Sequence, residues 1–146
     1  MSNLFIVNVE AAIYHEGKYL IIRRSEKEEH AGGLYSLVGG KVDFDDSSVS
    51  VLEETIKREV YEEIGIELSS DLEYVHSTTF RAGEVQVLDV VFLSRSFEGR
   101  PYIKSEDEIA EITWMTYDEV QDSIEIPPWT KKSVGMTEKL LGKIMN

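Results

Sequence analysis

Three glutamates near the middle of the chain are the feature that most constrains its fold. Residues 58–66 read REVYEEIGI, so Glu59, Glu62 and Glu63 stand at positions i, i+3 and i+4. On a helix this spacing places all three side chains on one patch of surface, where each close pair of like charges costs about 0.2–0.5 kcal/mol. A hard divalent cation would offset that repulsion, because such ions prefer carboxylate oxygen ligands. The stretch therefore predicts a helix that carries a metal site.

The bounds of this helix can be predicted from its flanks. Ser50 followed by Glu53 has the pattern of a capping box, in which each side chain accepts a hydrogen bond from the backbone N–H of the other residue. Gly65 is suited to the left-handed conformation that commonly ends a helix. We therefore expect a helix over residues 51–64.

On a helical wheel, the glutamates differ in their position relative to the apolar residues. At about 100° per residue, the helix has one apolar stripe. This stripe contains Leu52, Ile56, Val60 and Ile64. Glu63 falls inside the stripe and Glu62 falls just outside its edge. A solvated face with surface ion pairs would explain the polar side of the helix but not Glu63, since a lone carboxylate is costly to bury.

The stretch resembles the signature of the Nudix hydrolases, which is Gly, five residues, Glu, seven residues, then Arg-Glu-apolar-any-Glu-Glu-any-Gly-apolar. Residues 58–66 match its second half at every specified position. In the first half, Gly40 is followed by Asp46 in place of Glu. Eleven residues separate Asp46 from Arg58, which is four more than the pattern has. The predicted helix start places these four residues in the preceding loop, 41–50.

The resemblance implies roles for individual residues. Glu62 and Glu63 correspond to the principal metal-binding carboxylates. Glu59 corresponds to a glutamate that either binds metal or positions or deprotonates water. Gly39 corresponds to a residue whose backbone carbonyl often joins the metal ligands, and Arg58 to an organiser of helix and loop.

Further positions follow from the same resemblance. Asp46 would brace the loop ahead of the helix, and Gly65 would end the helix. Many members use one more acidic residue from a loop after the central strands. Residues 106–108, Glu-Asp-Glu, are the expected source here, and Glu108 is preferred for its spacing from Trp114. An ordinary acidic surface turn is the alternative for this segment.

The ligand types indicate the chemistry. Oxygen ligands select Mg²⁺, or Mn²⁺, over zinc. Such an ion withdraws charge from phosphate oxygens and activates water for attack. We therefore predict hydrolysis of a pyrophosphate linkage in a nucleoside diphosphate derivative.

The substrate is less constrained than the reaction. Arg24 and Gly40 are the candidate substrate contacts, with a surface charge as the alternative for Arg24. Residues 79–84 carry neither the proline nor the tyrosine that marks some subfamilies, which favours a nucleoside triphosphate or an unassigned nucleoside diphosphate derivative. Two alternatives stay open: cleavage of ADP-ribose or another nucleoside diphosphate sugar, and a catalytically silent ligand-binding module. Three aromatic side chains could stack on a base, although core packing is favoured for each: Tyr35, Phe80 and Trp129.

Composition bounds the class of protein. A chain of 146 residues fits one Nudix domain over 1–146. The net charge of −13 disfavours a nucleic acid polymer or an anionic membrane surface as partner. No apolar run reaches the length of a membrane span, and the N-terminus does not have the pattern of a signal peptide. With no cysteine in the chain, we expect a cytoplasmic protein, monomer or homodimer, that acts on a small phosphorylated molecule.

The order of the predicted elements indicates an α/β (α+β) fold, with a mixed sheet and helices on both faces. The Nudix resemblance implies an α/β/α sandwich of the same order. Strands are expected at 3–14, 19–24, 34–38, 73–81, 84–97 and 109–115. Helices are expected at 51–64, from about residue 117, and at 131–144.

Overall fold

The computed structural model describes residues 4–28, 32–43 and 49–145 of the chain. Its strands are β1 (Phe5–His15), β2 (Lys18–Arg24), β3 (Tyr35–Ser36), β4 (Val38–Lys41), β5 (Glu67–Leu68), β6 (Leu72–Ala82), β7 (Val85–Ser94), β8 (Phe97–Glu98) and β9 (Ile109–Met115). Its helices are α1 (Val51–Ile64), α2 (Tyr117–Asp122) and α3 (Pro128–Ile144). Within these parts of the chain, no helix combines the length and the apolar character that a membrane crossing needs.

Strand β1 is the centre of a mixed, seven-stranded sheet. The strands follow the order β3-β2-β1-β7-β6, while β4 pairs with β1 and β9 pairs with β2. β1 and β7 run parallel over nine residue pairs, and the other pairs are antiparallel. β1 and β2 form a hairpin that contributes only two residue pairs next to its turn. The parallel pair, which joins distant segments of the chain, therefore organises the sheet.

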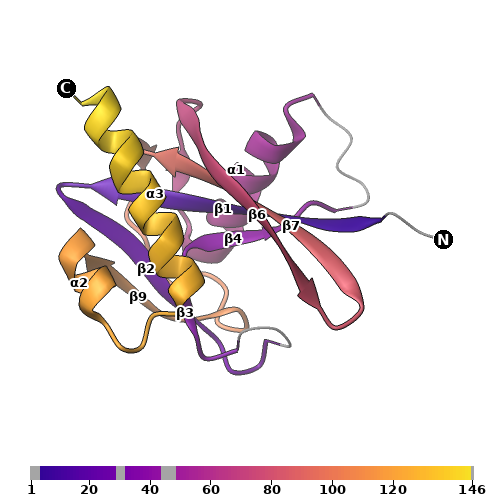
Figure 1. Ribbon diagram of the computed structural model, residues 1–146. Coiled ribbons are helices and arrows are strands. Elements are labelled where there is room, and N and C mark those ends of the chain that lie inside the picture. The colour runs from indigo at the N-terminus through magenta and orange to yellow at the C-terminus, as the bar shows by residue number, and fades with distance from the viewer. Residues whose placement is uncertain (1–3, 29–31, 44–48, 146) are drawn as a thin grey trace.

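The helices cover both faces of this sheet, as expected for a mixed sandwich (Figure 1). Because side chains alternate along a strand, Val9 and Ala11 of β1 pack toward α1, while Ala12 packs toward α3. Each face has its own apolar core, and Ile56, Val60 and Ile64 of α1 supply one side of the first. We refer to the two faces of the sheet as the α1 face and the α3 face.

Helix α1 has the predicted bounds but not the predicted capping interaction at its start. Gly65 follows it with φ of 73°, and its N–H donates to the carbonyl of Tyr61. The capping box is wrong: Ser50 is left-handed, with φ of 61°, and its side chain makes no capping hydrogen bond. A capping hydroxyl needs an extended backbone at this position, so Ser50 cannot serve. The helix start at residue 51 still places the extra residues of the box in the preceding loop.

Three further predictions differ from the structure. The strand expected at 84–97 ends at Ser94, and residues 97–98 instead form β8, which pairs with β5. Helix α3 begins at Pro128 rather than 131, because proline lacks the N–H that the first helical position does not use. Core packing is wrong for Phe80 and Trp129, which are 51% and 62% exposed.

Candidate active site

Helix α1 and the segment before β9 bring three carboxylates together. Glu59 and Glu63 project from α1 toward Glu108, and one oxygen of each lies within 4.8 Å of the others. Glu63 is 3% exposed, so the wheel predicted its burial correctly. Glu108 was preferred among the three acidic residues at 106–108, and it is the one of them that joins this group. We refer to Glu59, Glu63 and Glu108 as the three-carboxylate cluster.

The end of α1 holds Glu108 in place. The last carbonyls of a helix have no partner within the helix, and here the segment that leads to Glu108 supplies donors. The N–H groups of Lys104 and Ser105 donate to the carbonyl of Glu63 at 3.0 and 3.3 Å. The hydroxyl of Ser105 donates to Oε1 of Glu108 at 3.3 Å. The backbone of α1 that carries Glu63 thus also positions the carboxylate facing it.

The electrostatics of the cluster favour a cation. Burial, together with hydrogen bonding and repulsion from Glu108 and then Glu59, raises the pKa of Glu63 to about 10. Burial also raises the pKa of Glu59, against the opposing charge of Arg58. Oε1 of Glu63 is buried without a hydrogen-bond partner among the described residues. An unsatisfied oxygen of this kind fits a divalent cation, whose ligands are oxygen atoms of this type.

The guanidinium of Arg58 lies among three carboxylates. It donates to Glu59 Oε1 at 3.1 Å and lies 3.5 Å from both Glu62 Oε2 and Asp43 Oδ2. Glu62, expected as a principal metal ligand, lies at the edge of this arrangement with its side chain 54% exposed. The structure therefore places Glu62 beside Arg58, outside the three-carboxylate cluster.

The glycine pair has no room for side chains. A Cβ on Gly40 would lie 2.2 Å from Cδ of Glu59, so only glycine lets that carboxyl lie against β4. A Cβ on Gly39 would lie 2.1 Å from the carbonyl oxygen of Val9 and 3.0 Å from Cγ of Glu10. Because consecutive residues of a strand face opposite ways, the pair separates Glu59 on the α1 face from Glu10 on the α3 face.

The other residues predicted for the site do not belong to the three-carboxylate cluster. Arg24 lies 3.7 Å from Glu28 and close enough to Glu10 to oppose the effect of burial on the pKa of that carboxyl. Asp107 turns outward to Lys27 at 3.3 Å, and Glu106 is exposed. Asp46 lies outside the described residues.

Sequence reasoning missed a second polar group on the α3 face. Nδ2 of Asn8 donates to Oδ1 of Asp89 at 2.6 Å across the parallel pair β1–β7. Burial, followed by the charge of Asp89, raises the pKa of the neighbouring Glu10 well above its ordinary value. The available signal was an acidic residue within an apolar strand, as in VNVEAAI and VLDVV. We refer to Asn8, Glu10 and Asp89 as the sheet-face cluster.

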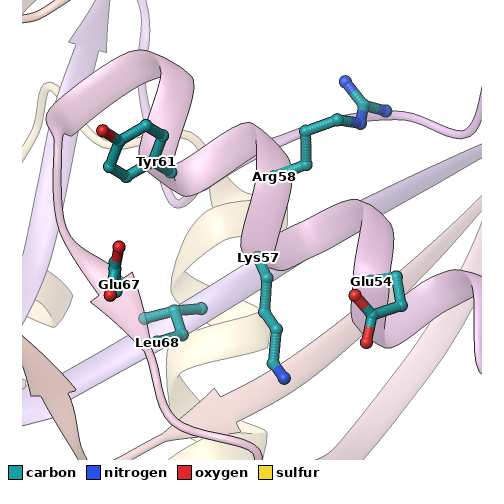
Figure 2. A pocket seen from close by; sticks show the side chains of 6 residues that line it. All are labelled: Glu54, Lys57, Arg58, Tyr61, Glu67 and Leu68. Atoms are coloured by element: carbon teal, nitrogen blue, oxygen red, sulfur yellow. The ribbon is translucent and has the colours of Figure 1, made fainter.

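A shallow hollow lies on the solvent side of α1 (Figure 2). Its lining is Glu54, Lys57, Arg58, Tyr61, Glu67 and Leu68. It includes no member of the three-carboxylate cluster, and Nζ of Lys57 is held by Oγ of Ser70 at 3.0 Å. This hollow therefore has no direct part in the chemistry that the carboxylates suggest.

Comparison with known proteins identifies the family. Residues 5–139 match the family model described as the NUDIX domain. A curated relative, the NAD-capped RNA hydrolase NudC of Mannheimia succiniciproducens, is 33% identical over 106 residues, which cover 70% of this chain. The match spans 37% of the length of that relative. The chain belongs to the Nudix hydrolase family, as its box indicated.

Solved structures show the same fold over nearly the whole chain. The MutT protein of Methanosarcina mazei Go1 is 27% identical, with a TM-score of 0.81 over 96% of this chain and 97% of its own. The MutT NUDIX hydrolase of Burkholderia pseudomallei is 25% identical, with a TM-score of 0.78 over 92% and 98%. The NUDIX domain of Shewanella oneidensis NrtR, solved with ADP ribose, is 16% identical, with a TM-score of 0.78 over 96% and 90%. At that identity, the last comparison concerns the fold alone.

The position of Glu108 gives a first testable expectation. Glu108→Gln should weaken binding of Mg²⁺ and lower kcat/KM by about 10- to 100-fold, since the cluster loses one charged ligand. Glu106→Gln and Asp107→Asn are matched controls from the same segment and should change both quantities less than about twofold, because exposed charges contribute little. Isothermal titration calorimetry with Mg²⁺ measures the binding, and steady-state kinetics measures kcat/KM, for the wild type and the three variants. Equal effects of all three substitutions would show that only the charge of the segment matters.

Proposed function

We propose that this protein hydrolyses a pyrophosphate linkage in a nucleoside diphosphate derivative, with Mg²⁺ or Mn²⁺ as cofactor. The observation that carries this proposal is the buried Glu63, with its unpartnered oxygen, facing Glu59 and Glu108. A fold that needed no cation would gain nothing from three carboxyls in this position, because burying charge without a partner is costly.

The residues have distinct proposed roles. Glu59, Glu63 and Glu108 would hold the metal, together with the backbone carbonyl of Gly39. The bound ion would lower the charge on the phosphate oxygens and the pKa of water. Glu59 is also the candidate to orient the attacking water or accept its proton, since Arg58 fixes its carboxylate at 3.1 Å. Arg58 is thus a positioning residue.

Glu62 has a separate proposed role. Its exposed carboxylate beside Arg58 would serve a more accessible metal position, as the family pattern implies, rather than the buried one. This role can be tested by the number of metal ions that the protein binds. Glu62→Gln should remove only the weaker of two metal-binding events and leave binding at the three-carboxylate cluster.

We propose a nucleoside triphosphate as the substrate, with Arg24 and the backbone at Gly40 as contacts. This choice is supported by residues 79–84, which carry neither the proline nor the tyrosine that marks some subfamilies. The alternative is a nucleoside diphosphate sugar such as the ADP ribose bound by the NrtR domain. A catalytically silent ligand-binding module is the second alternative, and the retained box glutamates argue against it. We further propose a cytoplasmic protein, monomer or homodimer, in which residues 1–146 form one domain.

A substrate screen tests this proposal. The purified chain is incubated with nucleoside triphosphates, ADP-ribose, other nucleoside diphosphate sugars and dinucleotides, with Mg²⁺, with Mn²⁺ or with EDTA. We expect metal-dependent release of pyrophosphate or a nucleotide from at least one substrate, identified by chromatography. No metal-dependent turnover of any substrate would leave only the ligand-binding module.

A further inference from the structure

Residues 102–105, which we call the strap, cross the end of helix α1 shortly before Glu108. Three of their N–H groups donate to the last two carbonyls of the helix, at 3.0–3.3 Å. The donors are Lys104 and Ser105 to the carbonyl of Glu63, and Tyr102 to that of Ile64. Because a helix end leaves its last carbonyls without partners, the strap attaches to α1 through its backbone.

The attachment changes what Glu108 can bind. Ser105 and Glu108 have the spacing of a capping box, in which the glutamate side chain accepts from the N–H of the serine. Here the N–H of Ser105 is used on Glu63 instead. The hydroxyl of Ser105 donates to Oε1 of Glu108 at 3.3 Å. The carboxylate is therefore held by the serine side chain, and it joins the three-carboxylate cluster rather than closing a capping box on its own turn.

Two side-chain contacts add to these backbone bonds. Nζ of Lys104 lies 3.6 Å from the centroid of the Tyr61 ring, which projects from the outer side of α1 (Figure 2). A Cβ on Gly65 would overlap the ring of Tyr102, so this ring packs directly on the glycine that ends the helix. The Nudix signature leaves the position of Tyr61 unrestricted, so its contact with Lys104 is a property of this chain.

We propose that Ser105 and Lys104 are positioning residues that hold Glu108 in the three-carboxylate cluster. Ser105 acts on the carboxylate itself through its hydroxyl, whereas Lys104 acts on the strap through the ring of Tyr61. This inference rests on the proposed function, because it takes Glu108 to be a metal ligand.

The proposal couples the strap to metal binding. Glu63 supplies both the carbonyl that accepts from the strap and a carboxylate of the cluster. If the strap left α1, the N–H of Ser105 would lose its partner, and the carboxylate of Glu108 would be free to close the capping box and leave the cluster. Metal binding and attachment of the strap therefore stabilise each other, since such a coupling is reciprocal.

Ser105→Ala removes the hydroxyl and keeps the backbone N–H. We expect it to weaken Mg²⁺ binding and to lower kcat/KM by about tenfold, the lower end of the effect of residues that orient a metal ligand. Ser105→Thr keeps a hydroxyl and should restore both quantities. Ser123→Ala is the matched control and should change neither, because its hydroxyl accepts from the N–H of Glu125 in the turn after α2. Titration calorimetry and steady-state kinetics measure the two quantities.

Combination with Glu108→Gln separates positioning from a general structural role. If the hydroxyl acts through Glu108, Ser105→Ala should cause no further loss of Mg²⁺ affinity in the Glu108→Gln protein, because the ligand that it orients is already altered. Losses that multiply in the double variant would show that Ser105 acts by another route, and would overturn its assignment.

The contact between Lys104 and Tyr61 has a smaller expected effect. Lys104→Met and Tyr61→Leu should each weaken Mg²⁺ binding by about two- to fivefold, the range of an exposed cation–π contact, and the double variant should lose no more than either one. Lys139→Met, an exposed lysine of α3, is the control and should have no effect. Independent losses from Lys104→Met and Tyr61→Leu would remove Lys104 from the proposal.

Hydrogen exchange separates this inference from the proposed function, because it needs no substrate. Mg²⁺ at about ten times its dissociation constant should slow exchange of the Lys104 and Ser105 amides by about tenfold in the wild type, but not in Glu108→Gln. The amide of Val120 in α2 is the reference and should slow less. Slower exchange of the strap without turnover of any nucleotide would refute the proposed function and retain the inference. Metal-dependent turnover with no difference between the strap and Val120 would retain the proposed function and refute the inference.

Discussion

Glu63→Gln should lower kcat/KM by about 100- to 1,000-fold while leaving the metal-free protein folded. Glu63 is buried at the centre of the three-carboxylate cluster, and its pKa of about 10 means that it is protonated at neutral pH without metal. A neutral glutamine has nearly the same shape as that protonated acid and, like it, carries both a donor and an acceptor. The substitution therefore removes the ligand but not the packing.

Because of Glu63, the stability of the metal-free protein should depend on pH. The pKa of Glu63 is raised in the folded state, so its proton stabilises the fold fully below the ordinary pKa of 4.5. That contribution is lost as the pH rises from there toward about 10. The metal-free wild type should lose stability relative to Glu63→Gln across this range, and Mg²⁺ should restore stability only in the wild type.

Thermal unfolding with EDTA or Mg²⁺, between about pH 5 and pH 9, measures both effects. Glu54→Gln is the matched control, since Glu54 is an exposed carboxylate of the same helix. It should change neither the activity nor the pH dependence. Full activity in Glu63→Gln together with a marked loss of stability would show that Glu63 is structural.

Gly40→Ala should damage the site through sterics alone. Its Cβ would lie 2.2 Å from Cδ and 2.4 Å from Oε2 of Glu59, so that carboxyl must move. Forcing atoms into a packed position costs about 1–3 kcal/mol of stability. A catalytic group displaced by about 1 Å can lose 100-fold in rate, so we expect a loss of about that size in kcat/KM.

Two comparisons test the cause of this effect. Gly142→Ala, in α3, meets nothing within 4 Å and should stabilise the protein by about 0.5–1 kcal/mol. In the double variant Gly40→Ala with Glu59→Ala, the clash is absent, so stability should recover while activity should not. Additive losses of stability in the double variant would contradict the proposed contact between Gly40 and Glu59. Urea unfolding and steady-state kinetics supply the values.

Local periodicity predicted the parts of the site that lie on α1. The burial of Glu63 follows from the 3.6-residue repeat of the apolar stripe, and the end of the helix follows from the left-handed conformation of Gly65. The failed capping box at Ser50 shows the limit of this reasoning. A residue type permits a cap, but the backbone of the preceding loop decides whether it forms.

The sheet-face cluster could not be predicted, because it depends on the pairing of segments that are far apart in the sequence. Asn8 and Asp89 meet only because β1 and β7 run parallel, and neither strand contains a signal for that partner or register. Each residue therefore looks like an isolated polar position in an apolar strand. Glu108 was predicted because many Nudix members use an acidic residue from this loop and because of its spacing from Trp114. No comparable pattern marks the sheet-face cluster.

The central claim is that the three-carboxylate cluster holds a divalent cation that the hydrolysis requires. Its most direct test is titration of the purified wild type and of Glu63→Gln with Mg²⁺ by calorimetry, with turnover of the best nucleotide followed on the same samples. The account predicts saturable binding and matching activation in the wild type, and loss of both in the variant. Equal Mg²⁺ binding and equal turnover in the two proteins would contradict it.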